Sequence, residues 1–505
     1  MPTVPAATEP VLPSAPVQPT PSGAPLHLPL TAVSGATLLL DPAGLPYLLV
    51  QGRAGEGQTG ADAPVYAVAL DAAGRARSGW PVVLAESGWL GEAVVDAAGT
   101  LYAVVGHGQG PSSLVAVLPD GRPAPGWPVQ LPTGCGGPPL VASDGTLRIT
   151  CYDGATRARV LALDRRGDGL PGWPVEVGGE IAEEALARGT DTILLVTGEG
   201  WVRHVRLRSD GTIESGQAVD VPVGAVYATN YALGPDGTGY AWWPDYQVPE
   251  TAEAETMLRL HLQAFDTDGL LPGWPLTIKG EVSPPAFGSD GRVYLTVGSQ
   301  RHGPTTIHAY DRNARGIPGW PVTLPVRAAI GWPGAGPWPP APVQIGADGT
   351  VYLVTEDSGT TIYALDPDGT VRTGWPYRSD AALADSCGRG GGGCGHPVIR
   401  PIVDGPGRLH IVHAAVDNSS HGDSAVLVGP TGRVADGWPV TLRRAYARFT
   451  ALQVAPDSMT YVLANEIDSH AADGRLLQSE TLLAIDPGGE VLYRTTVVEN
   501  LPADV

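Results

Sequence analysis

The sequence predicts an all-β fold, specifically a single β-propeller of eight or nine four-stranded antiparallel blades. Three observations predict it: a tripeptide that recurs along the chain, hairpin turns at fixed distances from it, and a turn-rich composition. The chain has 505 residues, of which 68 are glycine and 50 are proline, while 43% are hydrophobic. Such a composition is typical of many short strands joined by turns.

The tripeptide Gly-Trp-Pro ends one recurring hairpin. Each copy reads apolar-Ala-apolar-Asp, a glycine turn, and then Gly-Trp-Pro, as in VLALDRRGDGLPGWPV. The controlled spacing between turn and tryptophan predicts two antiparallel strands. A degenerate copy without tryptophan lies at 206–221, and a further copy closes the repeat at 482–497. The tryptophans of the full copies are Trp80, Trp127, Trp173, Trp274, Trp320, Trp375 and Trp438.

A second hairpin with an Asp-Gly type turn precedes each of these, so each module is predicted to hold four strands. One small sheet cannot bury both of its faces, whereas radial stacking of such sheets can. Nine modules are counted, with nine blades favoured, eight kept open and two separate rings as the alternative; residues 26–31 are expected to pair with the last module and lock the ring. The propeller is assigned to 26–505, with modules at about 35–83, 93–129, 139–175, 183–221, 229–276, 285–322, 341–377, 400–440 and 450–497.

The hairpin motif Ala-Leu-Asp-x-x-Gly-x-x-x-x-Gly-Trp resembles the tryptophan-docking blade motif of quinoprotein-type (PQQ-like) β-propellers. The likeness covers roughly 35–497 and concerns the fold. It implies that the seven motif tryptophans pack between neighbouring blades, and that the Asp and Gly shape the turn. A large aromatic residue repeated once per blade is likewise typical of core packing.

Charge, termini and cysteines set the expected compartment. The net charge of −21 disfavours a nucleic-acid partner, and no apolar run is long enough for a membrane span. Residues 1–25 are a proline-rich tether without the features of a signal peptide. Two local disulfides, Cys135 with Cys151 and Cys387 with Cys394, are the most economical pairing and suggest an extracytoplasmic location, with free thiols as the alternative and zinc disfavoured.

Candidate binding residues are placed on the face of the ring that carries the variable loops. In a four-stranded meander the two nearly constant turns share one face, and the longer, variable connections share the other. The tryptophans and tyrosine near those connections could bind a sugar or a protein, or else cap the blade ends. They are Trp89, Trp201, Trp242, Trp243, Tyr246, Trp332 and Trp338.

Metal and cofactor sites are weakly indicated. His396, His410, His413 and His421 cluster in one module, but we expect surface or packed histidines there and assign no metal. His410 and His413 are three apart on a strand and should point to opposite faces. Calcium stays open at 164–169 and 266–269, whose acidic turns lack a full ligand run.

The function expected from these features is that of a non-catalytic, extracytoplasmic propeller. It would bind proteins as a scaffold module of a bacterial cell-surface or envelope assembly, which could be a filament. A carbohydrate-binding or carbohydrate-cleaving propeller is the alternative, because two carboxylates on different blades leave no sequence trace. A PQQ-type oxidoreductase is disfavoured, since that family places adjacent cysteines over the cofactor and no two cysteines are adjacent here.

Overall fold

The computed structural model describes most of the chain beyond the first 25 residues, and every regular element in the described residues is a β-strand. The described residues are 26, 28–30, 33–52, 63–107, 110–152, 158–182, 185–222, 229–247, 257–298, 304–326, 342–355, 359–384, 399–415, 422–442, 447–468 and 477–502.

The strands form consecutive antiparallel sheets in chain order. The first sheet has seven strands: β1 (Val33–Leu40), β2 (Pro46–Gly52), β3 (Ala63–Ala69), β4 (Val82–Val95), β5 (Leu101–Gly106), β6 (Ser113–Val117) and β7 (Val129–Gln130). The long strand β4 pairs with β3 through 82–88 and with β5 through 89–95, so it joins two four-stranded units.

The next three sheets complete half of the chain. They comprise β8 (Leu140–Val141), β9 (Leu147–Tyr152), β10 (Ala158–Leu163) and β11 (Val175–Glu176); then β12 (Glu180–Ile181), β13 (Leu186–Arg188), β14 (Asp191–Gly198), β15 (Trp201–Leu207), β16 (Ile213–Ser215) and β17 (Val219–Asp220); then β18 (Asn230–Leu233), β19 (Gly239–Gln247), β20 (Met257–Asp266), β21 (Gly269–Leu270) and β22 (Leu276–Lys279).

Four further sheets follow. They comprise β23 (Glu281–Val282), β24 (Ala286–Phe287), β25 (Val293–Gly298), β26 (Thr305–Tyr310) and β27 (Val322–Leu324); β28 (Val343–Ile345), β29 (Val351–Thr355), β30 (Thr360–Leu365) and β31 (Tyr377–Ser379); β32 (Ile402–Val403), β33 (Leu409–His413), β34 (Ser424–Val428) and β35 (Val440–Thr441); and β36 (Arg448–Val454), β37 (Thr460–Asp468), β38 (Leu477–Ile485) and β39 (Val491–Pro502).

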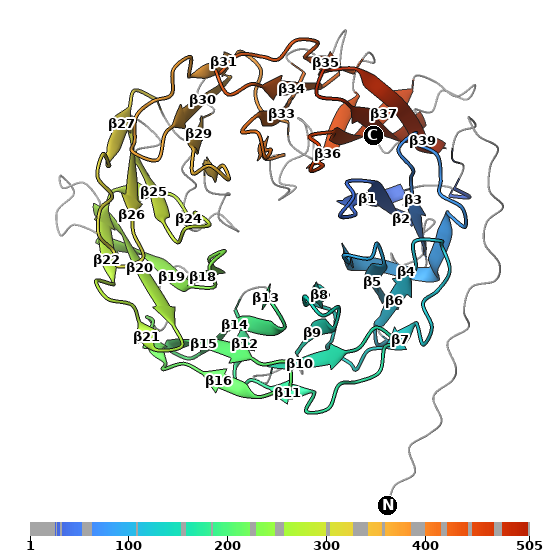
Figure 1. The fold of residues 1–505 in the computed structure, drawn as a ribbon, viewed down its shortest axis with the longest axis horizontal. Coiled ribbons are helices and arrows are strands. Elements are labelled where there is room, and N and C mark those ends of the chain that lie inside the picture. The colour runs from blue at the N-terminus through green and yellow to red at the C-terminus, as the bar shows by residue number, and fades with distance from the viewer. Residues whose placement is uncertain are drawn as a thin grey trace, which may run out of the picture.

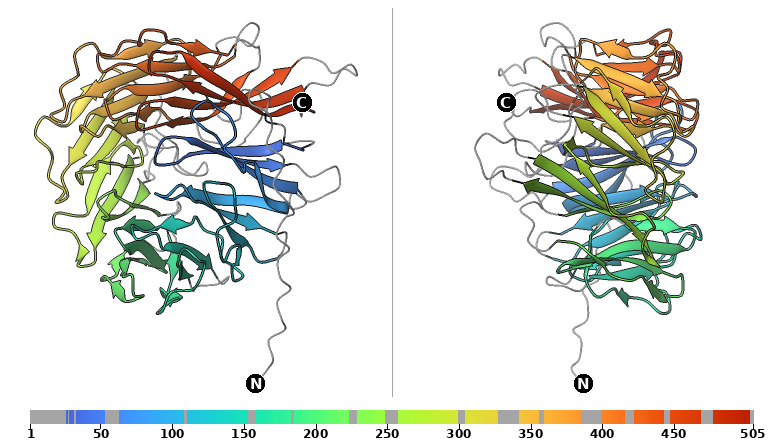
Figure 2. Two further views of the ribbon diagram at one scale, coloured as in Figure 1. Left: turned by 45° about the vertical axis from the view of Figure 1, so that its right-hand side comes forward. Right: turned by 90° about the vertical axis from the view of Figure 1, so that its left-hand side faces the viewer.

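The sheets stand side by side around a ring, with the first strand of each nearest the centre and the last at the rim (Figure 1). Figure 2 shows from the side that the ring is a thick disc rather than a sphere. Hydrophobic clusters lie between neighbouring sheets, so each sheet buries its two faces against two neighbours. We call each such contact a seam, whether it lies between neighbouring sheets or between the two four-stranded units that β4 joins.

Seven seams are joined by the motif tryptophans. Trp80, for example, donates its indole N–H to the carbonyl of Pro119, which lies in the outer turn of the next unit, over 3.0 Å. The other six make the equivalent bond at 2.8–3.2 Å, and all seven Trp–Pro peptide bonds are cis. The expectation that these tryptophans pack between blades is therefore matched by their contacts.

The glycine before each tryptophan is required by close approach. Gly319 has a φ of 88°, and a Cβ added there would lie 1.8 Å from the carbonyl oxygen of Asp368 in the next sheet. Backbone therefore meets backbone at this seam, and a side chain cannot be inserted.

The ring is locked where its last sheet meets its first. The backbone N–H of Leu26 donates to the carbonyl of Thr496 on β39 over 3.1 Å, while Leu26 and Leu28 are buried in a cluster shared by both sheets. The Oγ1 hydroxyl of Thr495 donates to the carbonyl of Gly74 over 2.6 Å. The segment that begins at residue 26 thus does at this seam what a tryptophan does at others.

We predict that Gly319→Ala destabilises the ring by several kcal/mol, about the range of strained or overpacked core substitutions, because the new methyl group meets a backbone oxygen. Denaturant unfolding checks this. The control is Gly316→Ala in the same turn, where a Cβ would meet nothing within 4 Å. Equal losses in both variants would contradict the close-contact argument.

A buried carboxyl group lies near the ring-locking seam. Glu480 is 9% exposed, and its Oε1 accepts a hydrogen bond from the Asn465 side chain over 2.8 Å, while Oε2 has no partner. Burial raises the pKa of Glu480 to about 7. The folded chain therefore binds a proton that the unfolded chain has released at the same pH.

Since the folded-state pKa is the higher one, we predict that stability falls as pH rises from about 4.5 through about 7. Glu480→Gln should remove this slope and make the protein more stable than the wild type at pH 8, by at most about 3 kcal/mol. Urea unfolding at pH 5 and pH 8 measures both, with the exposed Glu490→Gln as the control. A Gln variant that keeps the full slope would refute the assignment to Glu480.

Candidate functional site

The seams follow a common rule in their side chains as well as in their hydrogen bonds. In five of them the tryptophan stands edge-on to a tyrosine from the second strand of its four-stranded unit, with ring centroids 5.5–6.1 Å apart. Directly opposite each of these tyrosines, on the third strand, is an alanine, as in the pairs Tyr47 with Ala69 and Tyr352 with Ala364. The small alanine leaves room for the indole ring.

One seam departs from this rule at every position: the contact of the β12–β17 sheet with the β18–β22 sheet, which we call the Trp-free seam. Gln217, six residues after the turn glycine Gly211, stands where the tryptophan would be and is exposed. Ile193 occupies the tyrosine position, and Arg206 lies opposite it in place of the alanine. Three seam-filling residues are thus replaced together.

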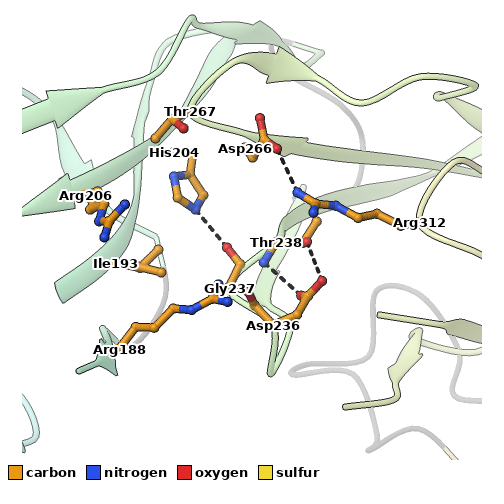
Figure 3. A pocket seen from close by; sticks show the side chains of 10 residues that line it. All are labelled: Arg188, Ile193, His204, Arg206, Asp236, Gly237, Thr238, Asp266, Thr267 and Arg312. Carbon is orange, nitrogen blue, oxygen red and sulfur yellow. Dashed lines mark hydrogen bonds and ion pairs between the residues drawn. The ribbon is translucent and has the colours of Figure 1, made fainter. Parts of the chain in front are cut away.

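A pocket of about 440 Å³ lies at this seam. Figure 3 shows that its side chains come from both sheets and from the next outer turn along the ring. The lining residues are Arg188, Ile193, His204, Arg206, Asp236, Gly237, Thr238, Asp266, Thr267 and Arg312. Asp236–Thr238 and Asp266–Thr267 belong to the constant inner and outer turns, so the pocket opens on the constant-turn face.

His204 is a buried titratable group in the lining of the pocket. It is 4% exposed, and its Nε2 lies 2.8 Å from the carbonyl oxygen of Gly237. A carbonyl oxygen can only accept, so Nε2 carries the hydrogen, and burial lowers the pKa of His204. The ring is therefore neutral at pH 7, and Nδ1 is an acceptor with no partner among the described residues.

Charged groups surround this histidine. Arg312 Nη2 bonds Asp266 Oδ2 over 2.8 Å, and Arg206 Nε bonds Asp191 Oδ2 over 2.7 Å. Arg188 donates from Nη1 to the backbone carbonyl of Asp236. Three guanidinium groups and two carboxylates line the pocket, and a third carboxylate, that of Asp191, pairs with Arg206.

Outside the pocket, a buried chain of Asp404, His410 and Thr460 resembles a catalytic triad of acid, base and nucleophile. His410 contacts Asp404 Oδ2 at 3.2 Å through Nε2, and Thr460 Oγ1 at 2.8 Å through Nδ1. All three are at most 6% exposed. No substrate can reach Thr460, so this chain links neighbouring sheets rather than doing chemistry.

The prediction that His410 and His413 point to opposite faces of their sheet is confirmed. His410 faces Thr460 of the following sheet, whereas His413 contacts Thr360 and Tyr377 of the preceding one. His396 and His421 lie outside the described residues. Within the described residues no group of three His, Cys, Asp or Glu side chains is placed to hold a metal ion.

The expected binding aromatics do not gather in one place. Trp89, on β4, is 40% exposed, and its indole lies over Gly106. Trp201, at the start of β15, is half-buried under the guanidinium of Arg203, whose Cζ is 4.3 Å from the ring centroid.

The remaining aromatics divide between core and undescribed segments. Trp242 is only 7% exposed within a core cluster, so the structure corrects the expectation that it offers a surface for a ligand. Trp243 stacks on His261 with ring centroids 5.5 Å apart. Tyr246 lies on β19, but its side chain is outside the described residues, as are Trp332 and Trp338.

The disulfide expected between Cys135 and Cys151 is present, with sulfur atoms 2.01 Å apart. Both cysteines are buried, and their backbones form an isolated antiparallel bridge. Cys387 and Cys394 lie outside the described residues. Within those residues no helix is long and apolar enough to cross a membrane.

The fold and its seams define the chain as a β-propeller. No family model and no curated protein matches its sequence. Solved structures to which it is similar include a quinoprotein alcohol dehydrogenase-like protein from Bacteroides thetaiotaomicron, with 13% identity, coverage of 85% of this chain and 94% of that one, and a TM-score of 0.32. A second is a eukaryotic initiation factor, with 11% identity, coverage of 76% of this chain and 82% of that one, and a TM-score of 0.43. A third is a puromycin-hydrolysing peptidase from Mycobacterium tuberculosis, with 15% identity, coverage of 92% of this chain and 64% of that one, and a TM-score of 0.37. At these levels the likeness concerns the fold alone.

The sequence-based site prediction fell on the variable loops, whereas the pocket lies among the constant turns. The signal that could have located it was the degenerate copy at 206–221, where Gln217 takes the tryptophan position and Arg206 takes the alanine position. A broken repeat marks a seam that must be filled in some other way.

We predict that restoring the rule fills the pocket. The triple variant Ile193→Tyr, Arg206→Ala and Gln217→Trp should raise the free energy of unfolding by about 1–3 kcal/mol, because an aromatic pair becomes buried. Thermal unfolding measures the gain. Gln217→Trp alone is the control and should gain less, because Arg206 still occupies the indole space; a destabilised triple variant would contradict this account of the seam.

Proposed function

We propose that this chain is a non-catalytic, extracytoplasmic nine-bladed propeller that binds protein partners as a scaffold module of a bacterial cell-surface or envelope assembly. The count of nine takes the seven-stranded sheet as two blades that share β4. The observation that carries the proposal is the Trp-free seam, where a polar pocket stands in place of the tryptophan–tyrosine packing of other seams. A seam left unfilled costs stability, which is consistent with a binding role.

One further observation supports binding rather than catalysis, and another supports a location outside the cytoplasm. The buried Asp404–His410–Thr460 chain is closed to substrate, and the disulfide between Cys135 and Cys151 fits an oxidising compartment.

The proposal predicts that the full chain is found in the envelope fraction and co-purifies with a surface assembly after mild cross-linking. A variant that lacks residues 1–25 separates contacts made by the proline-rich tail from contacts made by the ring. Retention of the partner by this variant assigns binding to the ring. A strictly monomeric chain in the cytoplasmic fraction, with no retained partner, would overturn the proposal.

A further inference from the structure

We propose that the Trp-free seam binds a carboxylate group of a peptide, received by Arg188 and Arg206 while a neighbouring N–H of the same peptide donates to His204 Nδ1. This inference rests on the proposed protein-binding function and names the chemistry that its pocket recognises. It is argued from the hydrogen bonds that the lining residues leave unmade.

The carboxylates in the pocket are already occupied. Asp236 accepts from the backbone N–H of Thr238 over 3.0 Å and from its hydroxyl over 2.9 Å. Asp266 accepts from the backbone N–H of Asp268 over 2.8 Å and from Arg312 at the same distance. Both acidic side chains therefore shape their own turns, and Asp266 also holds Arg312 in place.

The guanidinium donors are in surplus. Arg188 uses only Nη1, on a backbone carbonyl, and Arg206 commits Nε and Nη2 to Asp191. Nε and Nη2 of Arg188 and Nη1 of Arg206 are left without a protein partner in the described residues. Figure 3 shows both arginines on the same side of His204, with Arg312 on the other side against Asp266. Paired guanidinium N–H groups match the geometry of a carboxylate.

His204 sets the second requirement. Its Nδ1 is a buried acceptor without a partner, and an unmet buried acceptor is unfavourable by about 1–3 kcal/mol. A ligand that carries only oxygen acceptors would leave Nδ1 unmet. A peptide supplies both parts, because an amide N–H lies close to every terminal or side-chain carboxylate.

A peptide fits this lining better than an acidic sugar. Sugar rings are usually held by an aromatic face, and no phenylalanine, tyrosine or tryptophan lines this pocket. The aromatic pair that fills other seams is the pair that this seam has replaced, by Ile193 and Gln217. The experiment must therefore distinguish uronate binding from peptide binding.

Calorimetric titration of the full chain with four probes tests the inference. The probes are acetyl-tetraalanine with a free carboxylate, acetyl-Ala-Glu-Ala-Ala-amide, acetyl-tetraalanine amide and digalacturonate. We expect at least one carboxylate peptide to bind at least about tenfold more tightly than the neutral amide. That binding should weaken as salt rises from about 0.05 M to about 0.3 M. The first two probes distinguish a chain terminus from an acidic side chain.

Variants assign the binding to the pocket. Arg188→Ala should weaken it at least about tenfold, and His204→Leu, which restores the apolar residue found at the equivalent Leu114, should weaken it without abolishing folding. Arg122→Ala, at an exposed outer turn elsewhere, is the control and should bind as the wild type does. The triple variant Ile193→Tyr, Arg206→Ala and Gln217→Trp should stay folded and lose binding.

Three results would overturn the inference: carboxylate peptides that bind no better than the amide, binding that survives in the triple variant, or binding of digalacturonate alone. If the triple variant also keeps the partner found in the envelope fraction, the pocket inference fails while the proposed scaffold function stands. Loss of that partner together with the peptides would support both.

Discussion

The structure depends on one repeated contact, the indole N–H of a motif tryptophan bonded to a backbone carbonyl in the outer turn of the next sheet. The bond fixes where each sheet begins relative to its neighbour. The preceding glycine then brings two backbones together, so neither spacing nor angle can drift. Apolar clusters on both sides of every sheet supply the burial that a single small sheet lacks.

Two seams depart from this tryptophan contact, and each departure has a different consequence. At the ring-locking seam, Leu26, Leu28 and Thr495 replace the tryptophan contact with a strand-like segment and a hydroxyl bond. At the Trp-free seam the exposed Gln217 stands at the tryptophan position, and beside an apolar cluster that contains Phe265 the space is lined by guanidinium, carboxylate and imidazole groups. One exception joins the ends of the ring, and the other leaves a pocket.

The repeat predicted the propeller because periodic spacing reports directly on strand pairing and turns. It also predicted the packing of the motif tryptophans, the bond between Cys135 and Cys151 and the role of residues near 26, since each is local or follows from the period. The pocket was not predicted, because Arg188, His204 and Asp266 meet only when two sheets are placed side by side. Likewise, the burial of Trp242 depends on its neighbours across the seam rather than on its place beside a loop.

The pairing of Leu26 with Thr496 has a consequence for biosynthesis. The ribosome delivers the two partners at opposite ends of translation, so the early apolar residues Leu26 and Leu28 lack the last-sheet part of their native cluster while the rest of the chain is made. A nascent chain can stack its sheets in order, but it remains an open arc with apolar side chains uncovered at one end. Premature termination anywhere before the final sheet would therefore leave a product that proteases and chaperones can recognise.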